Sequence, residues 1–192
     1  MLSSVKKLKG DHYAIAYQLF KIIFHEIKFH EHSRRYLTRE EFKALRQYYL
    51  TWMKNTNVSK FYGHYFARRI KNAVKLIMDS DAAQPTVLDY GCGFGSESIA
   101  FGLLGAKVFG IDLGTKRINV ALKRLNYYKD RYANELDVSF KNMNILNCKF
   151  DKLFDVVYAK EFITHMYSIS KFVKFAKRVL KSNGYLIITD AN

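Results

Sequence analysis

Three glycines at two-residue spacing form the part of this chain whose chemistry is easiest to specify. The segment at 87–95 reads VLDYGCGFG: an apolar run ends in Asp89, and the glycines that follow are Gly91, Gly93 and Gly95. Glycine has no Cβ, so the backbone can adopt positive φ there and a ligand can approach the main chain closely. The short apolar helix expected over 96–104 would add unpaired N–H groups and the positive end of its dipole. The spacing therefore predicts a ligand-binding loop between a strand and a helix.

The glycine pattern departs from a dinucleotide-binding loop and resembles another class. A G-x-G-x-x-G fingerprint would need glycine at the position of Ser96. An acid, any residue and then G-x-G-x-G instead resembles motif I of the class I S-adenosylmethionine-dependent methyltransferases. Three later segments resemble that class in the same order: KVFGID at 107–112, FDVVYAKEFITHM at 154–166 and RVLKSNGYLIITD at 178–190. A lone glycine turn or a strand-ending aspartate is commonly only a turn or a helix cap, but the order and spacing together favour a cofactor site.

The resemblance implies S-adenosylmethionine as the cofactor and gives several residues a place on it. Asp89 would lie near the amino-acid end, and Asp112 would accept hydrogen bonds from both ribose hydroxyls. Asn144 stands where the family usually has an aspartate that meets the adenine amino group, and its amide oxygen can accept the same hydrogen bond. Leu113 and Ile145 would enclose the adenine ring. The residues expected to bind the cofactor are Asp89, Gly91, Cys92, Gly93, Gly95, Asp112, Leu113, Asn144 and Ile145.

Two residues just after the fourth expected strand are the candidates for catalysis. Glu161 and His165 are four positions apart, at the strand end where such sheets bind their ligands. They resemble a Glu-x-x-x-His pattern of the ubiquinone-pathway O-methyltransferases, in which a further Glu precedes the His; here that position is Thr164, and no metal site is expected. A neutral imidazole at His165 can remove a hydroxyl proton from the acceptor. The alternative is that His165 caps or packs the following helix, with catalysis resting mainly on alignment of the reacting atoms.

A parallel α/β sheet is needed to bring these residues together. The apolar runs predict strands at about 86–90, 107–112, 137–141, 154–159 and 185–190. Before them, patterns of helical period predict helices at about 11–30, 38–54 and 59–78, the second beginning with a capping box from Thr38 to Glu41. Pro85 then breaks the chain. We expect a helical region over residues 1–80 on the lid or acceptor side, followed by a Rossmann-like cofactor-binding core over residues 81–192.

The N-terminal helices carry apolar residues whose role has more than one interpretation. The first has an apolar stripe consisting of Ala16, Leu19, Phe20, Ile23 and Ile27. We expect this stripe to pack on the domain, with a dimer interface or an interfacial membrane contact as alternatives. The third carries the aromatic residues Tyr62, Tyr65 and Phe66, which are expected in the core rather than in a lid. The histidines of this region are expected at the surface.

Composition limits the class of protein. With 192 residues, 49% of them hydrophobic, the chain can bury one substantial core. Its two cysteines, Cys92 and Cys148, form neither a disulfide framework nor a zinc pattern. The first ten residues, MLSSVKKLKG, lack the apolar region of a secretory signal, and no apolar stretch approaches the length of a membrane span. We therefore expect a cytoplasmic protein without a transmembrane segment.

The formal net charge of +15 raises the question of an anionic partner. Residues 1–80 hold 16 Lys and Arg against 6 Asp and Glu, and residues 81–192 hold 16 against 11. Such an excess attracts nucleic acid, and Arg68, Arg69 and Lys71 are the candidates for contact with it. A solvated basic surface explains the same excess without a site and is the preferred interpretation.

The predicted function is methyl transfer to an oxygen or nitrogen of a small-molecule acceptor. An RNA methyltransferase is one alternative, but AKEF at 159–162 stands where such enzymes carry an Asn-Pro-Pro-Tyr-type motif. Class I enzymes normally add two strands after the fifth, and this sequence ends at Asn192. A fifth strand left at the edge favours a fragment, a homodimer, or a cofactor-binding partner subunit without activity of its own.

Overall fold

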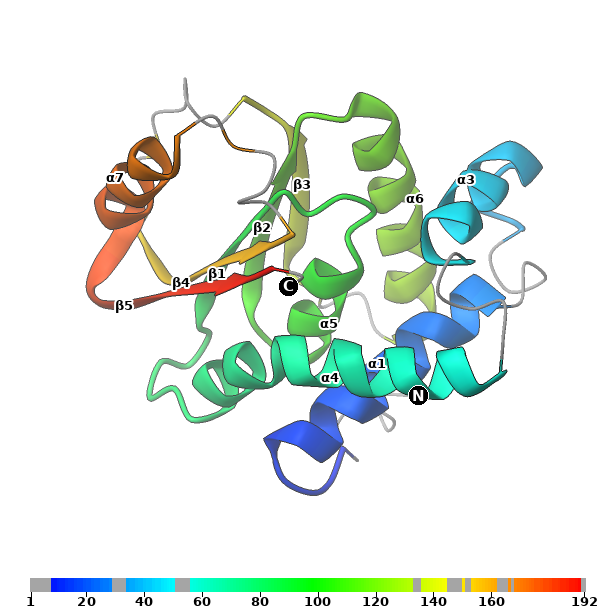
Figure 1. The fold of residues 1–192 in the computed structure, drawn as a ribbon, viewed down its shortest axis with the longest axis horizontal. Helices are drawn as coiled ribbons and strands as arrows, with labels where there is room; N and C mark the ends of the chain where they lie inside the picture. The colour runs from blue at the N-terminus through cyan, green and yellow to red at the C-terminus, as the bar shows by residue number, and fades with distance from the viewer. Residues whose placement is uncertain are drawn as a thin grey trace.

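A five-stranded parallel sheet forms the centre of the computed structural model (Figure 1). The structure describes residues 8–28, 34–50, 56–132, 136–144, 150, 153–161, 166 and 168–190. The strands, in the spatial order β3-β2-β1-β4-β5, are β1 (Thr86–Tyr90), β2 (Lys107–Asp112), β3 (Val138–Asn142), β4 (Phe154–Lys160) and β5 (Leu180–Thr189). The helices are α1 (His12–Lys28), α3 (Arg39–Leu50), α4 (Thr56–Met78), α5 (Ser96–Leu103), α6 (Thr115–Tyr132) and α7 (Ile169–Val179). The predicted α/β fold with a parallel sheet is confirmed.

Helices cover both faces of the sheet, which explains why the strands are apolar on both sides. Alternate residues of β1 show the division: Val87 belongs to the core under α1, α3, α4, α5 and α6, whereas Leu88 belongs to the core under α7. Figure 1 shows α7 on the opposite side of the sheet from α4 and α1. The sheet is therefore the middle layer of three.

Strand β1 lies at the point where the order of the sheet reverses. It pairs with β2 on one side and β4 on the other, so that Asp89 is in register with Gly110 and with Tyr158. The chain proceeds outward from β1 to β2 and β3 and then returns to β4. Ligands of such sheets bind outside the carboxyl ends of the strands at this reversal. The ends of β1, β2 and β4 are therefore where a site is expected.

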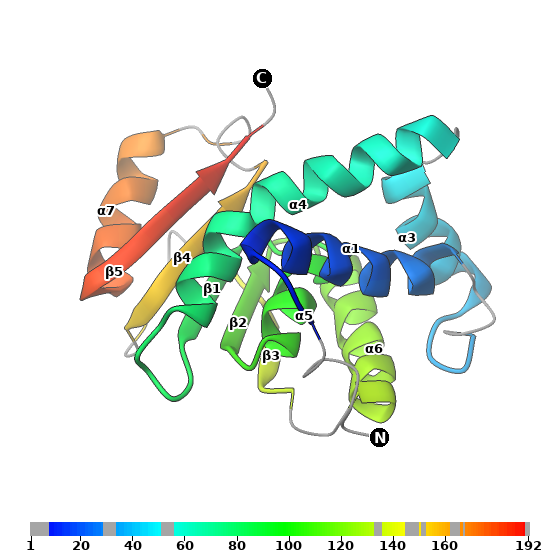
Figure 2. The same ribbon diagram turned by 90° about the horizontal axis from the view of Figure 1, so that it is seen from below.

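The N-terminal helices share one hydrophobic core with the helices of the sheet. Helix α1 lies beside α4 (Figure 2), and all five residues of its predicted stripe are buried. The capping box at the start of α3 is formed: the Thr38 amide donates to Glu41 Oε2 at 2.9 Å, and the Glu41 amide donates to Thr38 Oγ1 at 3.2 Å. None of the helices in the described ranges combines the length and apolar character needed to span a membrane.

Strand β5 begins earlier than the sequence indicated. The sequence predicts a strand at about 185–190, with Gly184 in a turn before it, but the strand starts at Leu180, directly after α7. The pairing of β4 with β5 shifts register between Phe154 and Val156, and a Cβ on Gly184 would lie 2.9 Å from the Phe154 carbonyl oxygen. Glycine thus permits a close backbone approach within the strand rather than a turn before it. Of the described strands β3 and β5 lie at the two edges of the sheet, and on β5 Tyr185 and Ile188 are exposed.

Candidate cofactor and active site

The glycine loop has the left-handed backbone that its sequence predicted. Gly91, Gly93 and Gly95 have φ of 75°, 55° and 77°. The loop is tied to β2, because the amides of Gly91 and Cys92 donate to the Ile111 carbonyl at 2.8 and 3.0 Å. A Cβ on Gly95 would lie 2.5 Å from the Phe140 ring, whereas a Cβ on Gly93 would meet nothing within 4 Å. Gly95 is thus closed in by the protein, and Gly93 faces open space at the reversal point of the sheet.

Asp112 connects the end of β2 to this loop. Its Oδ2 accepts a hydrogen bond from the Gly93 amide at 2.9 Å, although the two residues are 19 positions apart. Its Oδ1 accepts three: from the Gly114 amide at 2.6 Å, and from Nε and Nη2 of Arg117 at 3.0 and 2.7 Å. Oδ1 is therefore saturated, while Oδ2 has capacity for another donor. Arg117 is not among the residues predicted from the sequence, because a basic residue five positions after an acid is only a weak signal.

Asp89 is buried beneath the loop. Its carboxylate accepts a hydrogen bond from the Ser98 hydroxyl, and only 2% of the residue is exposed. Burial, with the negative charge of Glu97 as a second cause, raises the pKa of Asp89 to about 7. The carboxyl group is therefore poised to change charge near neutral pH.

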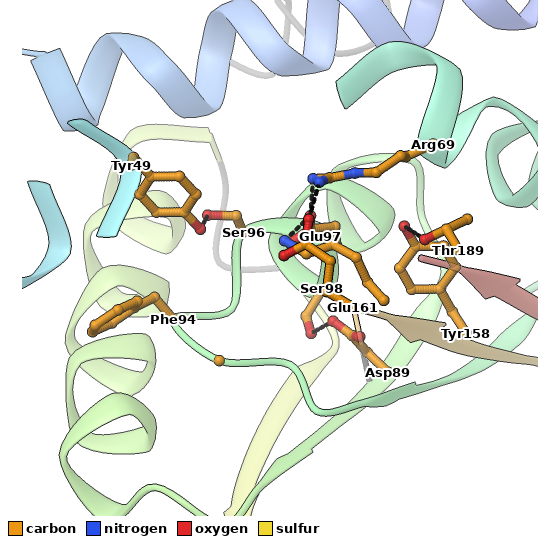
Figure 3. A network of polar contacts seen from close by, with 12 residues as sticks. Tyr49, Arg69, Asp89, Phe94, Ser96, Glu97, Ser98, Tyr158, Glu161 and Thr189 are labelled. Atoms are coloured by element: carbon orange, nitrogen blue, oxygen red, sulfur yellow. Dashed lines mark hydrogen bonds and ion pairs between the residues drawn. The ribbon is translucent and has the colours of Figure 1, made fainter. Parts of the chain in front are cut away.

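Next to Asp89 lies a cluster of alternating charges, which we call the ionic cluster: Arg69, Glu97, Lys160 and Glu161. Arg69 and Glu97 are buried, Lys160 is nearly buried and Glu161 is partly exposed. Figure 3 shows Arg69 pointing toward Glu97. Glu97 Oε1 accepts from Arg69 Nη2 at 3.1 Å and from Lys160 Nζ at 2.8 Å. Burial alone would raise the pKa of Glu97, but the two cations outweigh it and hold that pKa below its ordinary value. The cluster joins α4, α5 and β4 at the carboxyl end of the sheet.

Glu161, one of the two catalytic candidates, belongs to this cluster. Its Oε1 accepts from Arg69 Nη1 at 2.7 Å, and its backbone has a φ of 47°, which is unusual for a residue with a side chain. Residues held in such a conformation concentrate at functional sites. The Arg69 side chain points inward and only 7% of the residue is exposed, so of the three candidates for contact with nucleic acid only Arg68 and Lys71 are at the surface. The Nε atom of Arg69 is a buried nitrogen without a hydrogen-bond partner.

The remaining predicted residues have different outcomes. Leu113 is 66% exposed beside Asp112, and Asn144 is exposed just after β3. Ile145 and His165 lie outside the described residues. Tyr62 and Phe66 are buried in the core, as expected, and the Tyr65 ring lies 4.6 Å from the guanidinium carbon of Arg69. In the described part of the chain, no group of three or more His, Cys, Asp or Glu side chains could hold a metal ion.

The sequence is similar to those of known methyltransferases. A family model described as a methyltransferase domain matches residues 88–188, from β1 through the glycine loop to the penultimate residue of β5. The ubiquinone biosynthesis O-methyltransferase of Pelagibacter ubique is 35% identical over 106 residues, which are 55% of this chain and 42% of that protein. The mitochondrial enzyme of the same name from Rattus norvegicus is 30% identical over 132 residues, 63% of this chain and 36% of that one. The chain thus spans less than half the length of these relatives.

Solved structures share the fold. Phosphoethanolamine N-methyltransferase 2 from Haemonchus contortus, in complex with S-adenosyl-L-methionine, is 27% identical with a TM-score of 0.51, covering 61% of this chain and 26% of that one. A protein from Pyrococcus horikoshii is 30% identical with a TM-score of 0.50, covering 65% of this chain and 57% of that one. In each case the similarity covers a little over three fifths of this chain.

Proposed function

This chain belongs to the methyltransferase domain family, and from that premise we propose that it binds S-adenosylmethionine and transfers the methyl group to an oxygen or nitrogen of a small-molecule acceptor. The observation that carries the proposal is the link between Asp112 and the Gly93 amide. It joins the carboxyl ends of β1 and β2 at the reversal of the sheet, and Gly93 leaves open space there. A ligand with a ribose and an adjacent charged group suits that arrangement.

The residues around this link divide the binding of the cofactor among them. Asp112 Oδ2 accepts from the ribose, and Asp89 lies toward the amino-acid end, where its carboxylate favours an ammonium group. Asn144 accepts from the adenine amino group, with Leu113 and Ile145 against the ring. The cofactor supplies a methyl group on a sulfonium sulfur, which needs little chemical help beyond alignment. These roles accord with the position of each described residue at the carboxyl end of the sheet.

For the acceptor we propose an oxygen nucleophile on a small molecule, since the relatives named above are O-methyltransferases. His165 would take the proton of the acceptor hydroxyl, and Glu161 would orient the groups at the exit of β4 through its bond to Arg69. A cytoplasmic location and a homodimer that pairs through the edge strand are further parts of this proposal.

Calorimetric titration with S-adenosylmethionine and its demethylated product, S-adenosylhomocysteine, tests the proposal. We expect both to bind, and we expect Asp112→Ala to weaken binding by about 2–4 kcal/mol, because a buried carboxylate that accepts several bonds is removed. Asp137→Ala is the matched control, since its carboxylate pairs with Lys107 at the opposite, amino-terminal end of β2. Absence of heat with either compound, or tighter binding of NAD, would overturn the proposal.

A further inference from the structure

A second buried charge network, separate from the ionic cluster, connects α1 and α6 to the end of the glycine loop. Its centre is Arg124 in α6, which has no exposed surface. Arg124 Nε lies 2.9 and 3.0 Å from the two carboxylate oxygens of Glu26, and Nη2 donates to Glu26 Oε2 at 2.8 Å. Glu26 belongs to α1 and is also fully buried, and its Oε2 accepts from the Tyr128 hydroxyl at 2.9 Å. One edge of the guanidinium is thus fixed by a helix 98 positions earlier in the sequence.

The other edge of the guanidinium holds the loop. Arg124 Nη1 donates to the Phe94 carbonyl oxygen at 2.6 Å and to Ser96 Oγ at 2.9 Å. These two residues flank Gly95, whose left-handed backbone turns the chain into α5. The Tyr49 hydroxyl of α3 lies 2.6 Å from the same Ser96 oxygen (Figure 3). A single side chain therefore fixes both sides of the last glycine.

Stability alone does not explain a buried pair of this kind. Taking two charges out of water is unfavourable, and a buried ion pair is commonly no more stabilising than apolar residues of similar volume. An apolar pair would fill the same space, but it could not donate to Phe94 and Ser96. The planar fork of arginine, with donors on two edges, meets both requirements at once.

We infer that Arg124 is a positioning residue for the cofactor loop, held in place by Glu26, so that the affinity for the cofactor depends on the docking of α1. The inference rests on the proposed function for its ligand. The path is continuous: α1 fixes Glu26, Glu26 orients Arg124, and Arg124 sets the peptide groups beside Gly95. A ligand that binds the ordered loop then favours the docked α1 by the same free energy, because coupling between two sites is reciprocal.

The double variant Glu26→Met/Arg124→Met separates positioning from stability. It replaces the pair by apolar side chains of similar length, but it leaves the Phe94 carbonyl and the Tyr128 hydroxyl without these partners, so we expect a moderately lower melting temperature. At a temperature where the variant is fully folded, we expect a dissociation constant for S-adenosylhomocysteine at least about tenfold higher than that of the wild type. Lys107→Met/Asp137→Met, which removes an ion pair at the far end of the sheet, should leave the dissociation constant unchanged. A stable double variant with wild-type affinity would overturn the inference.

Hydrogen exchange provides a readout that needs no ligand. The amides of residues 91–96 should exchange faster in the double variant than in the wild type, while those of β4 stay protected. Unchanged exchange in the loop would refute positioning, whether or not the wild type binds the cofactor. Failure of the wild type to bind the cofactor would refute only the proposed function. If the double variant does not fold, Tyr128→Phe provides the test, because it removes only the hydroxyl that donates to Glu26 Oε2 and so loosens the hold on Arg124. It should raise the dissociation constant about twofold to fivefold, and an unchanged value would again refute positioning.

Discussion

Asp89 shows how burial of one carboxyl group makes the stability of the fold depend on pH. Its pKa is about 7 in the folded protein and near the ordinary value for aspartate in the unfolded chain. Below about pH 4 both states are protonated, and the contribution of the buried acid is fully present. Between about pH 4 and pH 7 the unfolded chain loses the proton while the folded protein keeps it, so the free energy of unfolding falls.

Asp89→Asn keeps an acceptor for the Ser98 hydroxyl but cannot ionise. We therefore expect the free energy of unfolding of the wild type to fall by up to about 4 kcal/mol more across this range than that of the variant. Urea unfolding of the wild type and the variant at matched pH gives the difference. The comparison cancels the opposite dependence from Asp155, whose pKa is held low by Lys181 and Thr86. A constant difference between the two proteins from pH 4 to pH 8 would show that Asp89 does not titrate as described.

Arg117 occupies the carboxylate oxygen of Asp112 that a second ribose hydroxyl of the proposed cofactor would need. Its guanidinium occupies Oδ1 with two bonds, although 46% of the side chain is exposed. Because water reaches the arginine end of this ion pair, the pair contributes only about 1 kcal/mol, and a hydroxyl donor of the ligand can displace it. We expect Arg117→Met to tighten the binding of S-adenosylhomocysteine by up to about fivefold, measured by titration at constant salt. Lys116→Met, a neighbouring exposed cation, is the control, and weaker binding in Arg117→Met would assign the arginine to the ligand instead.

At the scale of the element, two glycines of the loop between β1 and α5 have different roles: Gly95 allows close packing within the protein, and Gly93 leaves space for a ligand. Gly93 and Gly95 both have positive φ, so alanine at either position is strained by about 1 kcal/mol or more. Only Gly95 is crowded, with Phe140 at 2.5 Å and Ala121 at 3.1 Å from an added Cβ. We expect Gly95→Ala to lower the free energy of unfolding by about 1–3 kcal/mol more than Gly93→Ala does.

For ligand affinity we expect the reverse order, with Gly93→Ala more damaging than Gly95→Ala. An added methyl group at Gly93 projects into the open space beside Asp112, where the proposed ligand would lie. Gly93→Ala should therefore weaken S-adenosylhomocysteine binding by about tenfold or more while the protein remains folded. Equal effects of the two variants on both stability and affinity would mean that the loop has no ligand side.

The elements that the sequence predicted well are those whose pattern is local. Strands β1 and β2 have the predicted bounds because buried parallel strands are continuous apolar runs. The start of β5 was misplaced because Ser182, Asn183 and Gly184 indicate a turn, whereas pairing with β4 extends the strand through them. The partners of Arg69 and Arg124 lie 28 to 98 positions away in the sequence. No local pattern predicts such contacts, so the glycine loop was predictable and the networks that hold it were not.

At the scale of the whole molecule, the net charge of +15 allows a test of the nucleic-acid alternative. Because Arg69 is buried, Arg68 and Lys71 are the exposed cations in the segment 68–71 of α4. A solvated basic surface should bind RNA weakly, and the affinity should fall steeply between about 50 and 200 mM salt because phosphate counterions are released.

Two charge-reversed double variants distinguish a site from a general field. Arg68→Glu/Lys71→Glu changes α4, and Lys174→Glu/Lys177→Glu changes the exposed side of α7 on the other face of the sheet by the same amount. Since long-range attraction depends on total charge, we expect both variants to weaken RNA binding to a similar degree in a fluorescence titration at low salt. A loss confined to the α4 variant, together with tight, sequence-selective binding at physiological salt, would instead make RNA the acceptor and place it beside the ionic cluster.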